Sequence, residues 1–473
     1  RALTPTVREW WQPHAQGIEF GLDLDAPPPD EGPIFVDFAL RGATVLLDPS
    51  AATARLIDPA TAAPLLHVGG LLAWDAEGTP LDARFVAASP DRLRLRVNDA
   101  DAVYPITIDP ILTSMETTYP GAPGGGRMGY SVTSAGDVNS DGFDDLIVGE
   151  PYFDGAAGTD CGRVALHLGS GAGPQPVAVW TFEGDQAFAR LGRVVAGLGN
   201  ADGTLGDDVA LGVPDRSPST ISGAGTTFVF YATSAAPWLA VAPNFTVNGT
   251  VVSEECGGSI ATDAPDLNGD GRGDLIVACP EGHVPGNSSD PGRVDVWYGA
   301  PGGFTSTTPA VSILGVAAED ELGSSVANAG DVNGDGYDDL LVGVEDFDGA
   351  AGSDEGLVTL HVGSASGLVV APARTFTSGQ AGARLGSRVG GAGDLNGDGY
   401  ADLLVGAERW DGAFVDEGRV TVYLGSGAGP SASPTHTYFG GQTSAQAGGR
   451  ELTTSSGGTA GAFADTDGDG FDE

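Results

Sequence analysis

The segment Asp331-Val332-Asn333-Gly334-Asp335-Gly336-Tyr337-Asp338-Asp339 carries oxygen-bearing side chains at its positions one, three, five and nine, and glycine at position six. Loops of this kind fold around one hard cation, and Ca²⁺ is the ion that accepts many oxygen ligands in flexible geometry. The same spacing occurs in five segments: 137–145, 266–274, 331–339, 394–402 and 465–473. The sequence therefore predicts a chain that binds Ca²⁺ in tandem.

In each loop we expect the side chains of positions one, three, five and nine, and the main-chain carbonyl of position seven, to coordinate one Ca²⁺. Asp-Asn-Gly runs are also good turns, because Asx side chains cap their own backbone and glycine accepts positive φ. Five copies at one internal spacing favour metal binding over turns alone. The expected ligands are Asp137, Asn139, Asp141, Phe143, Asp145, Asp266, Asn268, Asp270, Arg272, Asp274, Asp331, Asn333, Asp335, Tyr337, Asp339, Asp394, Asn396, Asp398, Tyr400, Asp402, Asp465, Asp467, Asp469, Phe471 and Glu473.

A short apolar run follows four of these loops directly. Such runs are typical of buried strands, so the pattern is loop-to-strand and differs from the loop-to-helix order of an EF-hand. The runs are Leu146–Gly149, Leu275–Ala278, Leu340–Gly343 and Leu403–Gly406.

An irregular copy of the loop lies near residue 200, where the spacing of the others requires a member. It keeps Asn200, Asp202-Gly203 and an apolar run, but Leu198 replaces the first Asp and two extra residues precede Asp208. We expect no metal at this loop.

The repeat recurs every roughly 60 to 70 residues, which is long enough for one four-stranded antiparallel sheet. Radial arrays of such sheets are β-propellers. The innermost strands are expected to begin at residues 128, 191, 256, 322 and 385, the third strands at residues 162, 292, 356 and 418, and outer strands at 177–182 and 373–377.

The repeat resembles the FG-GAP repeat of integrin α-subunit β-propellers and of many bacterial secreted proteins. Its Phe-Gly and Gly-Ala-Pro signatures have counterparts at Met128-Gly129, Leu191-Gly192, Leu322-Gly323, Leu385-Gly386, Gly149-Glu150-Pro151, Gly212-Val213-Pro214, Ala278-Cys279-Pro280 and Gly406-Ala407. The resemblance covers about residues 120–473 and implies a propeller that usually closes with seven blades. Because Glu473 is position nine of the last loop and precedes its strand, we expect the natural protein to continue.

The fold class expected from these features is all-β, with two domains. Residues 1–110 form a small β-sandwich-like domain, and residues 111–473 form an FG-GAP propeller of about five blades plus the start of a sixth. The first domain is expected to place strands at 33–38, 43–47, 65–68, 71–74, 92–97 and 104–109.

The resemblance also implies a disulfide. Cys256 and Cys279 occupy the Phe position of Phe-Gly and the Ala position of Gly-Ala-Pro in one blade, on neighbouring strands. We therefore expect these two cysteines to pair, and Cys161 to remain unpaired.

Charge and composition point to a secreted or cell-surface protein. All 21 basic residues are Arg against 64 acidic residues, which gives a net charge of -43 and argues against nucleic acid or an anionic membrane as partners. No run of about twenty apolar residues is present to span a membrane. Calcium loops of extracellular affinity fill at millimolar Ca²⁺.

Two function classes fit these features. The first is a calcium-stabilised adhesion or scaffold protein that binds a protein, a glycan or a neighbouring subunit. The second is a non-catalytic accessory part of a larger secreted enzyme. The chain itself shows no nucleophile pattern, and His167 and His361 share their strand register with Trp297 and Tyr423, which indicates packing.

The integrin resemblance implies that a partner docks on the face opposite the calcium loops. The docking loops carried over by position are 151–161, 214–224, 280–291, 346–355 and 408–417. Tyr152, Phe347 and Trp410 are candidate anchors there, and an equally weighted alternative is that these rings cap the blade edges. The triplet Arg272-Gly273-Asp274 is not expected to be adhesive, because Asp274 is position nine of a calcium loop.

Overall fold

The chain divides into two compact units, Arg1–Thr118 and Tyr119–Glu473. A computed structural model describes residues 2–4, 7–14, 17–27, 33–39, 44–47, 54–57, 64–77, 79–89, 92–100, 102–113, 121, 125–170, 174–282, 291–315 and 320–449. Within these residues every regular element is a β-strand. The all-β expectation is therefore confirmed.

The first unit consists of two antiparallel sheets that share one core. One sheet has the strand order β1-β2-β3-β10-β7-β6-β5 and the other the order β4-β9-β8. Alternate residues of β9, such as Leu93 and Leu95, point into a core that also holds Phe85 and Ile106. The strands are β1 (Ala2–Thr4), β2 (Val7–His14), β3 (Gly17–Leu24), β4 (Ile34–Ala39), β5 (Thr44–Leu47), β6 (Ala54–Ile57), β7 (Pro64–Trp74), β8 (Ala83–Ser89), β9 (Arg92–Val97) and β10 (Ile106–Thr113).

The sequence identified only part of this unit. The expected strands 65–68 and 71–74 are one strand, β7, because Gly69 pairs with Ile111 of β10 and the chain passes through a register shift there instead of turning. Strands β1, β2, β3, β6 and β8 were not predicted.

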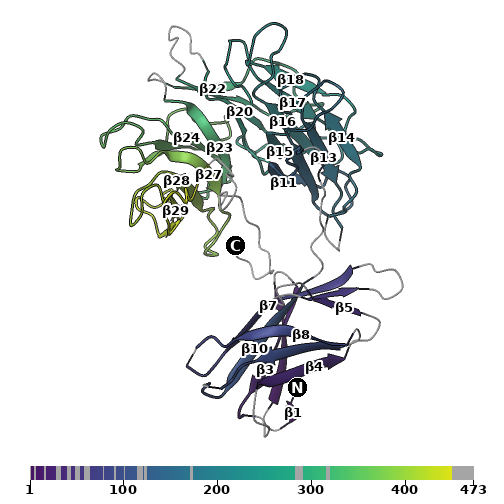
Figure 1. Cartoon of the computed structure of the whole chain (residues 1–473). Helices are drawn as coiled ribbons and strands as arrows, with labels where there is room; N and C mark the ends of the chain where they lie inside the picture. The colour runs from purple at the N-terminus through teal and green to yellow at the C-terminus, as the bar shows by residue number, and fades with distance from the viewer. Residues whose placement is uncertain are drawn as a thin grey trace. The chain divides into compact units, whose positions relative to one another are not determined.

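The second unit contains five four-stranded antiparallel sheets, each formed by consecutive strands (Figure 1). We name them blades one to five in chain order. Their strands are β11 (Ser131–Gly136), β12 (Asp145–Glu150), β13 (Arg163–His167), β14 (Trp180–Glu183); β15 (Val194–Gly199), β16 (Asp208–Val213), β17 (Thr226–Phe230), β18 (Phe245–Asn248); β19 (Ser259–Ile260), β20 (Leu275–Cys279), β21 (Arg293–Trp297), β22 (Val311–Leu314); β23 (Leu322–Gly330), β24 (Asp339–Val344), β25 (Leu357–His361), β26 (Arg374–Thr377); β27 (Leu385–Gly391), β28 (Leu403–Ala407), β29 (Arg419–Tyr423) and β30 (His436–Phe439).

Successive blades pack through their first strands. Strand β11 contacts β15, β15 contacts β19, β19 contacts β23 and β23 contacts β27. This is the arrangement of an open β-propeller, as the repeat period predicts. In every blade the nine-residue loop or its irregular copy joins the first strand to the second.

The hydrophobic core lies between neighbouring blades and not inside single ones. Leu275 and Val277 of β20 pack toward blade two, whereas Ile276 and Ala278 of the same strand pack toward blade four. Because both faces of each second strand are covered, these strands are continuous apolar runs without polar alternation.

A glycine just before the third strand lets the backbone of a blade lie against the segment that leads into the first strand of the next blade. Gly162 forms a parallel bridge with Leu191, and Gly356 forms the same bridge with Leu385. A Cβ at Gly162 would lie 2.1 Å from the Leu191 carbonyl oxygen, and its φ is +83°. No other residue fits this close backbone approach.

Candidate metal centres

The four regular loops within the described residues share one backbone structure, illustrated by 331–339. The N–H of Asp335 donates to Asp331 Oδ1 at 3.0 Å and to Asn333 Oδ1 at 2.8 Å, and the N–H of Gly336 donates to Asp331 Oδ2 at 2.8 Å. The N–H of Tyr337 donates to Asp335 Oδ1 at 3.2 Å. The loop therefore folds around the side chains of its positions one, three and five.

The same four hydrogen bonds recur in the other three loops. In loop 266–274, for example, the N–H of Asp270 donates to Asp266 Oδ1 at 3.0 Å, and the N–H of Gly271 donates to Asp266 Oδ2 at 2.8 Å. Loops 137–145 and 394–402 match in all positions. The side chains of positions one, three and five of these four loops thus share one hydrogen-bonded turn, although within the described residues no loop brings oxygens of all three of its carboxylates within 4.8 Å of one another. The predicted ligands of loop 465–473 (Asp465, Asp467, Asp469, Phe471 and Glu473) lie outside the described residues.

The carboxylates of position nine are buried and link two strands of the blade. Asp339 is fully buried; its Oδ2 accepts the N–H of Val332 at 3.3 Å and its Oδ1 accepts the N–H of Gly363, which follows the third strand, at 2.9 Å. Asp145, Asp274 and Asp402 make the equivalent pair of bonds. The carboxylate of position nine therefore connects the nine-residue loop to the end of the third strand.

Burial raises the pKa of these buried carboxyl groups. Desolvation is the largest cause, and the negative charges of positions one and five add to it. The pKa rises to about 7 for Asp274 and Asp339 and to about 6 for Asp145, and it is also raised for Asp402. A bound cation would counter this effect, because it stabilises the charged form.

The donor set of each regular loop fits Ca²⁺. It consists only of oxygen, from three carboxylates and one amide, which suits a hard cation. Within the described residues, no N–H donates to the main-chain oxygens of Phe143, Arg272, Tyr337 or Tyr400. These are the position-seven carbonyls that the sequence assigns as ligands.

The irregular loop has the same nine-residue length as the others, because Gly199 pairs with Asp208 as Gly136 pairs with Asp145. The expectation that Leu198 replaces the first Asp and that two extra residues precede Asp208 is therefore wrong: Leu198 lies in the core between blades two and three, and positions one, three and five are Asn200, Asp202 and Thr204. Asp208 is fully buried and still accepts the N–H groups of Ala201 at 2.9 Å and Ala232 at 2.8 Å. The blade-building bonds are therefore present, but Asp202 is the one carboxylate among positions one, three and five of this loop.

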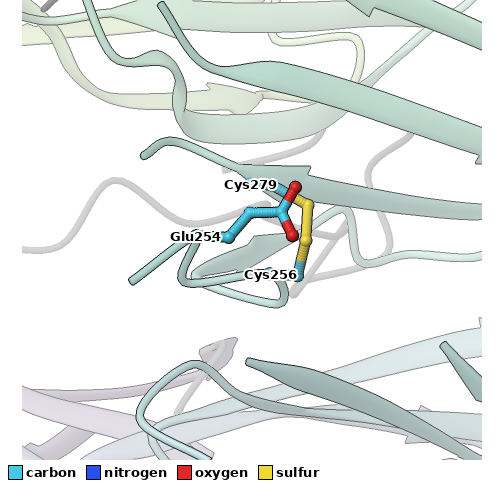
Figure 2. A group of neighbouring side chains, drawn as sticks. All are labelled: Glu254, Cys256 and Cys279. Atoms are coloured by element: carbon cyan, nitrogen blue, oxygen red, sulfur yellow. A yellow bond between two sulfur atoms is a disulfide. The ribbon is translucent and has the colours of Figure 1, made fainter. Parts of the chain in front are cut away.

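A different group of potential ligands lies beside blade three. In the described part of the chain, Glu254, Cys256 and Cys279 are the group of three whose ligand atoms lie within 4.8 Å of one another (Figure 2). The two cysteines form a disulfide with a Cα–Cα distance of 4.0 Å, as predicted, and Cys161 is buried and free. Glu254 is fully buried and pairs with Arg293. The disulfide and the ion pair make this a structural cluster and not a metal site.

Two of the three predicted aromatic anchors, Tyr152 and Trp410, pack against arginine side chains. The ring of Tyr152 lies 4.4 Å from the Arg127 guanidinium carbon and 5.6 Å from that of Arg190, and Arg419 lies 3.6 Å above Trp410. Tyr152, Phe347 and Trp410 are all half-buried. This packing favours the alternative that the rings cap the blade edges.

Exposed apolar side chains that the sequence did not single out lie on loops of the same end. Phe188 is 60% exposed and its N–H donates to the carbonyl of Thr159 in the β12–β13 loop, and Val415 in the β28–β29 loop is also 60% exposed. Nothing in the local sequence distinguishes these residues from buried apolar ones.

Two further sequence predictions can be placed. Asp274 is fully buried, so the triplet Arg272-Gly273-Asp274 does not present its carboxylate at the surface. His167 and His361 are also buried, and desolvation lowers the pKa of both imidazoles.

Family models place the repeats in the sequence. Residues 266–342 match the FG-GAP-like repeat, and residues 128–167 and 386–423 match the FG-GAP repeat. The chain carries FG-GAP repeats. The matches at 128–167 and 386–423 cover the first three strands of blades one and five, and the match at 266–342 runs from the loop of blade three into the second strand of blade four.

Similarity to named proteins falls into two groups. The chain is 32% identical to integrin alpha-IIb of Mus musculus over 213 residues, which cover 44% of this chain and 20% of that protein. It is 32% identical to integrin alpha-PS2 of Drosophila melanogaster over 231 residues (47% and 15%). It is also 32% identical to phosphatidylinositol-glycan-specific phospholipase D of Homo sapiens over 183 residues (37% and 21%). The chain thus spans about a fifth or less of the length of these relatives. Within the described residues, no helix is long and apolar enough to cross a membrane.

Proposed function

We propose that this chain is a calcium-stabilised extracellular or cell-surface scaffold, in which regular loops each hold one Ca²⁺ and the propeller presents a rigid face to a partner. The observation that carries the proposal is the shared geometry of loops 137–145, 266–274, 331–339 and 394–402, in each of which the carboxylate of position one accepts the N–H of the glycine at position six. Three carboxylates in one loop repel each other, and a divalent cation removes this repulsion.

The partner proposed is another protein, bound at the end of the propeller opposite the calcium loops. Similarity to integrin alpha chains supports a role in interaction with other proteins. The exposed side chains of Phe188 and Val415 supply apolar surface at that end, since buried apolar anchors provide much of the affinity of protein interfaces.

The second candidate is a non-catalytic accessory part of a secreted enzyme, and similarity to phospholipase D favours it. The flanking sequence of the natural protein discriminates between the two candidates. A catalytic domain there supports the accessory role, whereas further repeats or a surface anchor support the scaffold.

The calcium proposal is tested by thermal unfolding in about 2 mM Ca²⁺, a concentration of the order of extracellular levels. The same measurement is made in EDTA and in Mg²⁺ at equal ionic strength. A ligand that binds only the folded state raises the melting temperature by mass action. We expect EDTA to lower the melting temperature of the unmodified chain. This decrease should exceed the decrease that any single position-one Asp→Ala substitution causes in Ca²⁺, because EDTA empties all the sites and the substitution removes one. Identical transitions in Ca²⁺ and EDTA would contradict the proposal.

A further inference from the structure

Three regular loops, 137–145, 266–274 and 331–339, are each contacted by the blade that follows. The N–H of Asp338 in blade four donates to the carbonyl of Asp266 at 3.2 Å, and the N–H of Ala401 in blade five donates to the carbonyl of Asp331 at 3.0 Å. Asp266 and Asp331 are position one of their loops, and the residues that reach them are position eight of the next. The backbone of position one is therefore fixed from outside its own loop.

At two interfaces the side chain of position eight adds a second bond. Asp338 Oδ2 accepts the N–H of Asp266 at 3.0 Å and an N–H of the Asn328 amide at 3.1 Å. Between blades one and two, Asp207 Oδ2 accepts the N–H of Asp137 at 2.8 Å. The carboxylate thus reaches across the interface to the residue that centres the neighbouring metal loop.

Position seven also covers the preceding loop. A Cβ on Gly269, position four of loop 266–274, would lie 2.6 Å from the ring of Tyr337, and one on Gly334 would lie 2.5 Å from the ring of Tyr400. The rings rest on the glycines of the neighbouring loops. Together, the residues at positions seven and eight of one blade pack on and hydrogen-bond to the nine-residue loop of the blade before it.

We propose that Asp207 and Asp338 are positioning residues for the calcium sites of the preceding blades, 137–145 and 266–274, without being ligands themselves. This inference rests on the proposed calcium function. Each carboxylate fixes the peptide of the central Asp and places a negative charge beside the site, and both effects favour a bound cation. Calcium binding in one blade is thereby coupled to the docking of the next, since each stabilises the other.

The chain supplies matched controls. Asp144 is also position eight, but its carboxylate is exposed and accepts Ser134 Oγ of its own blade at 3.3 Å. At the interface of blades four and five, position eight is Ala401, so loop 331–339 has the backbone bond without the carboxylate. Ala401 lies over Gly330 as Asp207 lies over Gly136, so Ala401→Asp adds the missing group in the same geometry.

The experiment measures Ca²⁺ bound per chain against free Ca²⁺ by equilibrium dialysis. In the double variant Asp207→Ala/Asp338→Ala, two sites are expected to bind about tenfold more weakly, a change of about 1.4 kcal/mol per site. Asp144→Ala should bind like the unmodified chain, and Ala401→Asp should tighten one site.

The outcomes separate the two proposals. Absence of bound calcium in the unmodified chain overturns the proposed function and this inference together. Normal binding in the unmodified chain, with the double variant indistinguishable from Asp144→Ala, overturns this inference alone. Should the alanine variants not fold, Asp207→Asn/Asp338→Asn keep the shape and the acceptor but remove the negative charge, and binding equal to that of the unmodified chain would overturn the electrostatic part of this inference.

Discussion

Loop 266–274 of blade three and the irregular loop of blade two end on the same carboxylate but differ at their centres. Asp274 and Asp208 are both fully buried and both accept an N–H from just beyond the third strand, while Asp274 accepts one N–H from its loop and Asp208 accepts two. Asp266, position one of the first loop, accepts two N–H groups of that loop, whereas position one of the irregular loop is Asn200, whose amide donates to the carbonyl of Thr204. The comparison separates two features that the repeat combines: position nine builds the blade, and positions one, three and five carry the carboxylates that the proposed metal sites require.

The largest expected effect is at position nine. Asp208→Ala and Asp274→Ala each leave buried N–H groups without an acceptor, so each should lower the free energy of unfolding by about 3–5 kcal/mol, at about 1–3 kcal/mol per orphaned group. Denaturant unfolding in EDTA measures this without a metal contribution. A severe loss for Asp274→Ala with none for Asp208→Ala would show that position nine acts only through the metal.

Blade two has no regular loop, and the connection from it to blade three is instead tied by the disulfide. The N–H groups of Glu255 and Cys256 donate to blade two carbonyls, and Cys256 is bonded to Cys279 of β20. Replacing both cysteines by alanine should cost about 3 kcal/mol through loop-closure entropy. Denaturant unfolding should show this loss in Ca²⁺ and in EDTA alike. A loss of stability in only one of these conditions would contradict the view that the disulfide and the calcium loops stabilise the propeller independently.

Position one should affect calcium with a smaller effect on the fold. Asp266→Ala should lose one bound ion and lower stability in Ca²⁺ by about 1–2 kcal/mol, since its capping bonds are exposed and the lost ion contributes by mass action. The matched variant Asn200→Ala in the irregular loop should leave the number of bound ions unchanged. Equilibrium dialysis provides the count, and equal counts for both variants would remove the distinction between the loops.

The smallest expected effect is on pH dependence. Burial raises the pKa of Asp208 to about 7, while three backbone N–H groups partly oppose this. A folded-state pKa above the unfolded value of 3.8 gives a stabilising contribution that is complete at low pH and is lost as pH rises toward 7. Asp208→Asn should flatten this part of the stability profile, measured as melting temperature against pH from 4 to 8. An unchanged profile would show that Asp208 is ionised throughout that range.

Much of the propeller could be predicted from the sequence because the same pattern of loop and strand recurs in several repeats. The loop spacing predicted the turns, and runs such as Leu340–Gly343 predicted strands with both faces buried, as found for β24. The disulfide of Cys256 followed from its position in the repeat. These features depend on residues close to one another in the sequence, so they can be recognised from the sequence alone.

The contacts between blades could not be predicted in the same way. The doubled acid at Asp207-Asp208 and Asp338-Asp339 is visible in the sequence, but which oxygen faces which blade depends on how two sheets dock. The first unit does not show the repeat, and the two strands expected at 65–68 and 71–74 are one continuous strand, β7. Likewise Tyr152 is polar and on a loop, yet two arginines from distant segments hold it.

The most direct test of the account is an anomalous-scattering map of calcium, recorded at long wavelength from crystals grown in Ca²⁺. The account predicts one peak within each of loops 137–145, 266–274, 331–339 and 394–402, beside the position-seven carbonyl, and none in the irregular loop around Asn200 and Asp202. Empty regular loops under millimolar Ca²⁺, or a peak in the irregular loop equal to the others, would contradict it.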